Sequence, residues 1–238
     1  MAKGQRISEV ELCRTYNLGI VEYDEALRLQ EQLVKARLAG DLSDTILFLQ
    51  HPPVLTIGAA RGEQNIIASK DLLANEGVTI YHTDRGGDIT YHGPGQLVGY
   101  LIFNLETKGR DLHQYVRNLE EVIIRTLRDY CITAHRDPKY PGVWVGDEKI
   151  CALGIRFTRW VTKHGFALNI NNELQYFSYI HPCGITDRGV TSMSLLLEHE
   201  LIIEDVISCI IKHSSQVFNM VIQQESSGQL GKYYQFRG

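Results

Sequence analysis

The chain has 238 residues, of which 44% are hydrophobic and 22% charged, and its formal net charge at pH 7 is -4. This composition is ordinary for a globular protein, and the length suits one large domain, so we expect residues 1–238 to form a single domain. The weakly acidic balance argues against a dedicated nucleic-acid-binding protein. The longest clear apolar run, residues 97–103, is far too short to span a membrane.

The N-terminal residues and the cysteines bear on the cellular location. Residues 1–6 lack the apolar segment of a signal peptide, and Glu9 and Glu11 count against a mitochondrial presequence. The five cysteines are odd in number and contain no C-x-x-C pair. We therefore expect no disulfide framework, no metal site and a location in the reducing cytoplasm.

In the first half of the chain the pattern predicts one helix followed by several strands. Residues 24–40 have apolar side chains near helical spacing and end at a glycine, which predicts a helix. Strand-forming residues fill 45–58 but are interrupted by His51-Pro52-Pro53, which should mark a kink or a sheet edge. Residues 78–83 and 96–105 are predicted to be further strands.

Two more helices are predicted in the second half. Residues 111–130 carry a continuous apolar stripe, and residues 203–220 carry a similar one. The tail after Gln223 is polar and contains glycines, so we expect it to be loosely held.

Between these helices, residues 142–171 read as consecutive strands. We expect breaks at 146–148 and at 162–165, where turn-forming residues gather. Strands outnumber helices and do not alternate strictly with them. This order favours an α+β fold over a doubly wound sheet.

The most unusual segment is the glycine-rich stretch 85–96, which holds four glycines and a proline among polar residues. Such a stretch is either a hairpin rich in turn residues or a loop whose backbone approaches a ligand, with about even odds for an anonymous glycine cluster. Arg85, Tyr91 and His92 within it favour the binding role.

Several common active-site motifs are absent from the sequence. Residues 93–99 miss the G-x-G-x-x-G dinucleotide spacing by one position, and no G-x-x-x-x-G-K-[ST] phosphate loop occurs. G-x-S-x-G is also absent, and His199-Glu200 lacks the second histidine of a zinc protease helix. The sequence therefore gives no motif evidence for a serine hydrolase or a zinc protease.

Cys183 and Lys149 are the strongest candidates for catalysis. Cys183 lies between a proline and a glycine, a backbone suited to aiming a sulfur atom from a loop. Lys149 lies where a polar turn meets an apolar segment, and partial desolvation there would lower its pKa and suit it to proton transfer. Taken singly, a cysteine is more often buried filler, and a lysine more often a surface charge. The other cysteines, which lie in or beside apolar runs, are expected to be filler: Cys13, Cys131, Cys151 and Cys209.

Four blocks, in order along the chain, closely resemble the lipoyl(octanoyl) transferase family. They are R-G-G-D-I-T-Y-H-G-P-G-Q at 85–96, G-V-W-V-G-D-E-K-I-C-A-L-G-I-R at 142–156, H-G-F-A-L-N-I at 164–170 and P-C-G-I at 182–185. Together they cover about the central half of the chain and are highly specific.

This resemblance implies the fold of biotin and lipoate protein ligases, a mixed β-sheet flanked by helices. It also implies a catalytic pair, with Cys183 as the nucleophile and Lys149 as its acid/base partner. The residues that match the family's acyl-binding segments are Arg85, Gly86, Gly87, Asp88, Ile89, Thr90, Tyr91, His92, Ala152, Leu153, Gly154, Gly165, Phe166 and Ala167. From these we expect an apolar slot whose wall includes Ile89, Leu153 and Phe166.

The implied reaction moves an octanoyl or lipoyl group from acyl carrier protein to a lysine of a lipoyl domain, through an acyl-cysteine thioester. The implied acceptors are the lipoyl domains of 2-oxoacid dehydrogenases and the glycine cleavage H protein. No cofactor, nucleic acid or membrane is expected to take part. Two alternatives remain open: an ATP-dependent lipoate or biotin ligase on the same fold, and a non-catalytic acyl-binding protein.

Overall fold

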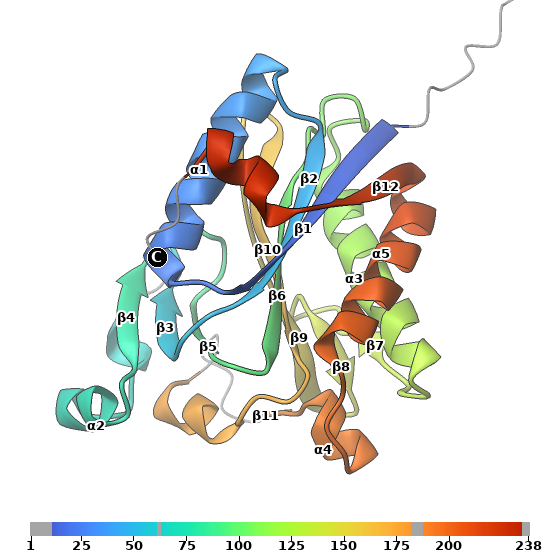
Figure 1. Ribbon diagram of the computed structural model, residues 1–238. Helices are drawn as coiled ribbons and strands as arrows, with labels where there is room; N and C mark the ends of the chain where they lie inside the picture. Colours follow the sequence, from blue (N-terminus) through green and yellow to red (C-terminus); the bar gives the residue numbers. More distant parts are fainter. Residues whose placement is uncertain (1–10, 61–62, 182–187, 235–238) are drawn as a thin grey trace, which may run out of the picture.

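The computed structural model describes residues 11–60, 63–181 and 188–234. Within these ranges the largest element is a nine-stranded sheet with both parallel and antiparallel pairs. Its strands are β1 (Glu11–Ile20), β2 (Asp44–Gln50), β6 (Gln96–Ile102), β7 (His135–Arg136), β8 (Val143–Val145), β9 (Glu148–Thr158), β10 (Val161–Asn169), β11 (Gly189–Val190) and β12 (Met220–Glu225). The spatial order is β12-β1-β2-β6-β10-β9-β8-β7, with β11 paired to β9 (Figure 1).

Helices cover both faces of this sheet, which confirms the predicted fold class. They are α1 (Tyr23–Ala39), α2 (Lys70–Asn75), α3 (Leu112–Asp129), α4 (Met193–Leu197) and α5 (Ile203–Phe218), with 3-10 helices η1 (Glu63–Asn65), η2 (Gln175–Tyr179) and η4 (Ser227–Lys232). α1 lies on one face, where Leu29 and Leu33 pack against Val98 of β6 (Figure 1). α3 and α5 lie on the opposite face, where Ile123 and Ile210 belong to one core cluster.

A second, three-stranded sheet adjoins the large one. It consists of β3 (Val54–Ile57), β4 (Thr79–His82) and β5 (Ile89–His92), in the order β4-β3-β5. The predicted break at His51-Pro52-Pro53 is confirmed, because these residues separate β2 of the large sheet from β3 of the small one. Proline has no N–H to donate to a strand ladder, so the first sheet cannot continue through this point.

The expected strand break at 162–165 is wrong. β10 runs unbroken through these residues and pairs with β6 on one side and β9 on the other. The turn lies earlier, at Arg159 and Trp160, whose φ angles are +46° and +66°. Gly165 has a packing role instead, since a Cβ there would collide with the carbonyl of Gly99 on β6.

Two further expectations are wrong. The described part of the tail, residues 224–234, is held against the fold, because β12 pairs in parallel with β1 and Leu230 in η4 is fully buried in the cluster beneath α1. Cys131 is exposed rather than core filler, and it has a φ of +60° just after α3 ends. Local composition predicts neither outcome, because tertiary packing decides which of these residues is buried.

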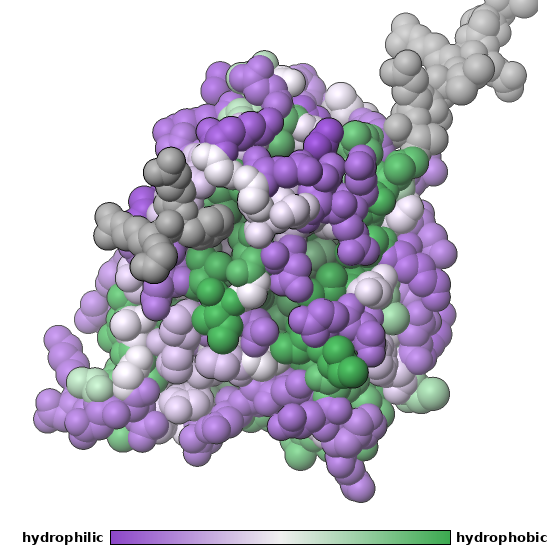
Figure 2. Space-filling view, viewed as in Figure 1, coloured by the Kyte–Doolittle hydropathy of each residue, from purple (hydrophilic) through white to green (hydrophobic). Residues whose placement is uncertain are grey.

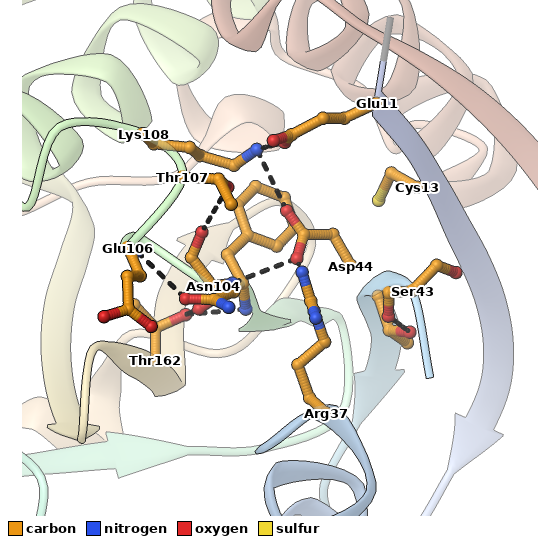
Figure 3. A network of polar contacts seen from close by, with 12 residues as sticks. Glu11, Cys13, Arg37, Ser43, Asp44, Asn104, Glu106, Thr107, Lys108 and Thr162 are labelled. Atoms are coloured by element: carbon orange, nitrogen blue, oxygen red, sulfur yellow. Dashed lines mark hydrogen bonds and ion pairs between the residues drawn. The ribbon is translucent and has the colours of Figure 1, made fainter. Parts of the chain in front are cut away.

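A buried polar network ties α1, β1 and β2 to the turn that precedes α3 (Figure 3). Asp44, at the start of β2, accepts hydrogen bonds from the Arg37 Nε and the Asn104 backbone N–H, each 2.9 Å away. Lys108 Nζ lies 3.1 Å from the other Asp44 oxygen and also pairs with Glu11. Burial raises the pKa of Asp44 and lowers the pKa of Lys108 to about 8.

The surface is mostly polar, with separate apolar areas on the face shown in Figure 2. Leu12 and Val221 are exposed apolar residues that lie opposite each other on β1 and β12. Among the helices within the described ranges, none combines the length and apolar character needed to cross a membrane.

Candidate functional site

A cavity of about 530 Å³ lies where β6, β10 and β9 run side by side beneath the glycine-rich segment. This volume is typical of small-ligand sites. Most of the predicted site residues line it: Lys149, Arg85, Gly86, Gly87, Asp88, Ile89, Thr90, His92, Ala152, Leu153, Gly154, Gly165, Phe166 and Ala167. The fold thus brings three segments that are far apart in the sequence to one hollow.

The predicted nucleophile, Cys183, lies outside the described residues. Of the cysteines that the structure describes, Cys13 and Cys151 are fully buried. Burial raises the pKa of both thiols, so they stay protonated and unreactive. These two cysteines are core residues, as expected.

Lys149 reaches the cavity because β9 carries a bulge. Val143 of β8 pairs with Cys151, whereas the next residue, Trp144, pairs with Lys149, so Ile150 is an extra residue in β9. A bulge changes the alternation of side chains along a strand. Ile150 and Cys151 therefore both enter the apolar core. Lys149 turns to the opposite face, with its Nζ 4.8 Å from the centre of the Trp144 ring.

The glycine-rich segment lies directly against β9. The Gly86 N–H donates a hydrogen bond of 3.0 Å to the carbonyl of Ile155. A Cβ on Gly154 would lie only 3.1 Å from the Arg85 side chain and from the Gly86 carbonyl. Close backbone approach here requires glycine.

Arg85 anchors this segment to the small sheet. Its side chain is buried, and its guanidinium donates to the backbone carbonyl and the hydroxyl of Thr56 at 2.6 Å and 2.9 Å. The charged group is therefore directed toward β3. Charge-assisted hydrogen bonds of this kind hold the loop backbone in place beside the cavity.

Tyr91 is the one described residue of the predicted set that does not line the cavity. Its ring stacks on Tyr176, with the ring centres 4.8 Å apart, in the core of the small sheet. A Cβ on Gly93 would collide with the Tyr91 hydroxyl. Tyr91 therefore supports the fold behind the cavity wall.

Polar side chains that the sequence analysis did not single out form much of the remaining wall: Tyr23, Gln96, Tyr100, His164 and Asn169. Tyr100 is held by His51, which is fully buried. The His51 Nδ1–H donates to the carbonyl of Val21 at 2.7 Å, so its Nε2 accepts from the Tyr100 hydroxyl at 2.8 Å. Burial lowers the pKa of His51 to about 4, which keeps the imidazole neutral.

Three histidines line the cavity, and the two buried ones, His92 and His164, are neutral for the same reason. His92 donates from Nδ1 to Gln96 at 2.8 Å, and Gln96 donates in turn to Asn169 at 2.9 Å. His164, with a φ of +63°, donates from Nε2 to Asp84 at 2.9 Å. Burial lowers the pKa of both imidazoles, and the hydrogen bond from His164 holds the pKa of Asp84 below its usual range. The wall is polar, and its two buried imidazoles are uncharged.

One signal in the sequence marks part of this wall. Gln96 and Tyr100 are polar groups inside an otherwise apolar strand, and buried polar groups need partners. No signal of this kind marks Tyr23, because a tyrosine at the start of an amphipathic helix is common in cores.

Ile89, Leu153 and Phe166, expected in the wall of one slot, all line the cavity, but they come from different core clusters. Leu153 and Phe166 pack with the core beneath α3, whereas Ala167 belongs to the cluster beneath α1. Ile89 belongs to the core of the small sheet. Adjacent residues of a strand face opposite sides, so the cavity includes surfaces on both sides of the large sheet.

The family model of the lipoyl protein ligase A/B catalytic domain matches residues 22–215. The chain belongs to this family. It is 53% identical over 203 residues to an octanoyltransferase of Caldicellulosiruptor saccharolyticus, covering 84% of this chain and 86% of that protein. It is 46% identical to an octanoyltransferase of Desulforamulus reducens, covering 85% and 89%. This member of the family is an acyltransferase, as expected.

Solved structures of lipoate and biotin protein ligases share the fold at low sequence identity. A lipoate-protein ligase A bound with ATP superposes with a TM-score of 0.77 at 16% identity, covering 92% of each chain. A biotin protein ligase from Aquifex aeolicus in complex with biotin and ATP gives 0.53 at 14% identity, covering 87% of this chain and 70% of that one. The expected ligase-type fold is confirmed.

Proposed function

We propose that this acyltransferase moves an octanoyl or lipoyl group from acyl carrier protein to a specific lysine of lipoyl domains, the first step of protein lipoylation. The relatives' shared name, octanoyltransferase, supports the acyl group. The observation that carries the proposal is the single cavity into which Lys149 and three family-matched segments converge. The proposed acceptors are the lipoyl domains of 2-oxoacid dehydrogenases and the glycine cleavage H protein.

The proposed reaction runs in two halves through Cys183. Lys149 takes the proton of the Cys183 thiol, and the thiolate attacks the carbonyl carbon of the donor thioester. The bond to the carrier's sulfur breaks, and that thiolate takes the proton from the Lys149 ammonium. The acceptor amine then attacks the acyl-cysteine, an amide bond forms, and the Cys183 sulfur leaves as the proton of the amine passes to Lys149. A thioester is already activated, so no ATP is consumed.

The buried imidazoles of the wall suit an uncharged acyl chain. His92 and His164 carry no charge for the chain to desolvate, and the buried guanidinium of Arg85 is turned to its hydrogen-bond partner Thr56. Burying about six methylenes at roughly 0.8 kcal/mol each contributes about 5 kcal/mol to binding. That is enough to hold the chain and to sense its length.

The test is incubation with octanoyl-acyl carrier protein followed by intact mass measurement. The native protein should gain one octanoyl group, and Cys183→Ala should gain none. Cys131→Ala is the matched control, because Cys131 is exposed and remote from the cavity lining. Lys149→Met should form the adduct far more slowly. Normal transfer by Cys183→Ala without an adduct would contradict the mechanism.

An ATP-dependent ligase is the rival function, since a structural neighbour of this chain is a lipoate-protein ligase bound with ATP. Free octanoate and ATP should give no acyl-adenylate with this protein. Detection of acyl-adenylate, with transfer that survives Cys183→Ala, would favour the rival.

We further propose that residues 1–238 act as one catalytic domain in the cytoplasm, where buried thiols such as those of Cys13 and Cys151 stay reduced.

A further inference from the structure

The cavity continues around the outer edge of β9 to the far face of the large sheet. Residues 152–155 are all half-buried, although neighbouring side chains of a strand face opposite sides. Ala152 and Gly154 face the glycine-rich segment, and Leu153 and Ile155 face the side of α3. All four line the same cavity. This part of β9 therefore has open space on both faces.

Between Cys151 and Ile155 the outer edge of β9 has a short stretch without strand pairing, and the two spaces meet there. On one side of it, Cys151 is paired with Val143 of β8. On the other side, the carbonyl of Ile155 accepts from the Gly86 N–H. Backbone groups alternate in direction along a strand, so the N–H and C=O of Leu153, between them, point outward through the same edge. Within the described residues, no hydrogen bond to either group occurs across that edge.

We call the space on the α3 side of this edge the β9 groove. Its walls are Leu153 and Ile155 on the strand and Leu112 and Val116 on the helix. Leu112 and Val116 are four residues apart and so lie on one face of α3. Farther out, the exposed side chain of Arg117 also lines the cavity. These four walls are apolar, and the N–H and C=O of Leu153 lie between them. The buried carboxylate of Glu120 also lines the cavity and pairs with Arg117 at 3.1 Å.

We propose that the β9 groove binds the flexible, amide-containing arm through which the donor presents its thioester. This subsite rests on the proposed function and extends it from the acyl chain to the carrier's arm. The arm's amide pairs with the N–H and C=O of Leu153, and its methylenes pack on Val116 and Ile155. The arm's thiol end then points through the opening toward the face that carries Lys149.

Other occupants fit the groove less well. The stem of an acceptor lysine has no amide to pair with Leu153. A strand of the acceptor domain would need a longer free edge, because the pairing at Cys151 and the bond to Ile155 leave only Leu153 open. An acyl chain has no polar group for the unpaired donor and acceptor, and leaving them buried without partners is unfavourable.

The first test compares donors in the native protein. Octanoyl-pantetheine carries the arm's amides, and the octanoyl thioester of 2-mercaptoethanol carries none. We expect kcat/KM for acyl-enzyme formation to be about two- to tenfold higher for each amide that pairs. Equal kcat/KM values for the two donors would overturn the proposal.

The second test narrows the groove with Val116→Trp and uses Gln114→Trp as the control. Gln114 is exposed on the same helix and does not line the cavity. Val116→Trp should raise KM for octanoyl-pantetheine at least tenfold and change kcat/KM for the amide-free donor less than twofold. An equal loss with both donors, a shift in preferred chain length, or a loss only in transfer to the acceptor would overturn the proposal.

A binding measurement separates this proposal from the proposed function. Unacylated pantetheine cannot be turned over, and calorimetry should show it binding to the native protein and to Gln114→Trp but at least tenfold more weakly to Val116→Trp. Binding with this pattern supports the groove even if no acyl-enzyme forms. Equal affinity for the native protein and Val116→Trp, or no binding to either, overturns the groove even if octanoyl transfer proceeds.

Discussion

Two regions of this protein bury polar side chains, one as neutral groups and the other as charged pairs. The wall of the cavity uses the neutral imidazoles of His92 and His164, and neutral His51 supports Tyr100 behind it; each makes a hydrogen bond. The network around Asp44 uses full charges, with Arg37 and Lys108 paired to one carboxylate. Both regions are largely buried, and in both the cost of burying polar groups is largely offset by hydrogen-bond or ion-pair partners.

The difference follows from the surroundings of each region, because one faces a cavity and the other does not. The cavity wall faces an empty hollow that, in our proposal, an uncharged chain fills and leaves in each turnover. The charged group of Arg85 in this wall is turned toward Thr56, and a neutral imidazole that faces the chain changes its hydration little. The Asp44 network lies outside the cavity lining, so its ion pairs can hold α1 and two strands to the turn before α3 without a ligand beside them.

Breaking the charged region should have the largest effect on stability. Asp44→Ala leaves Arg37 and Lys108 partly buried without their carboxylate, and removing one partner of a buried ion pair costs about 3–5 kcal/mol. Urea denaturation should therefore show a much lower midpoint. Glu106→Ala, which removes an exposed pair with Arg110, is the control and should change the midpoint little. Equal, small effects would mean that the network is not needed for stability.

The buried neutral imidazole of His51 should make the free energy of unfolding decrease at acidic pH. The unfolded chain binds a proton at an ordinary histidine pKa of about 6.5. Folded His51 binds it only at about 4. Between these values the unfolded state holds more protons, so the free energy of unfolding falls with decreasing pH by about 1.4 kcal/mol per pH unit for each such imidazole. The contribution is complete above about pH 6.5 and is lost as the pH falls through about 4.

The measurement is urea denaturation at several pH values between these limits. His51→Gln should flatten the dependence relative to the native protein, whatever its effect on absolute stability. His199→Gln, at an exposed position, should leave the slope unchanged. A slope unaffected by His51→Gln would mean that His51 is not held neutral by burial.

A smaller effect is expected from a single hydrogen bond of the neutral region. Tyr100→Phe removes the hydroxyl that donates to His51 and leaves the His51 Nε2 buried without a partner. Such a loss costs about 1–3 kcal/mol. A double-mutant cycle with His51→Phe should give a double variant more stable than the sum of the single losses predicts. Additive losses would show that the two side chains do not depend on each other.

The sequence predicted the parts of the fold that depend on periodicity and on proline. The stripe of α3 and the break at Pro52-Pro53 required only local rules. The position of the β9–β10 turn was missed, because Arg159 and Trp160 are not typical turn residues and adopt positive φ only in the folded chain. The tail was missed because its burial depends on pairing with β1, which is about 200 residues away in sequence.

The sequence predicted which segments form the site but not how their side chains are arranged around the cavity. The blocks around Arg85, Lys149 and Gly165 carry strong sequence patterns, and all of them line the cavity. The bulge at Ile150, which decides the face on which Lys149 lies, leaves no mark in the periodicity. Neither does the pairing of Tyr100 with His51, because hydrogen bonds between distant strands are set by tertiary contact.

The smallest effect is expected from a larger side chain in the wall of the cavity. Ala167 is buried beside Val98 and opposite Ala152, so Ala167→Leu adds carbons where we propose that the acyl chain lies. We expect kcat/KM for an octanoyl donor to fall about tenfold, because room for about two methylenes is lost at roughly 0.8 kcal/mol each. A six-carbon donor should lose less. Val161→Leu, on the same strand but outside the cavity lining, should change neither value. Equal losses with both donors would place the chain elsewhere, and the neutral wall would then serve the fold rather than the substrate.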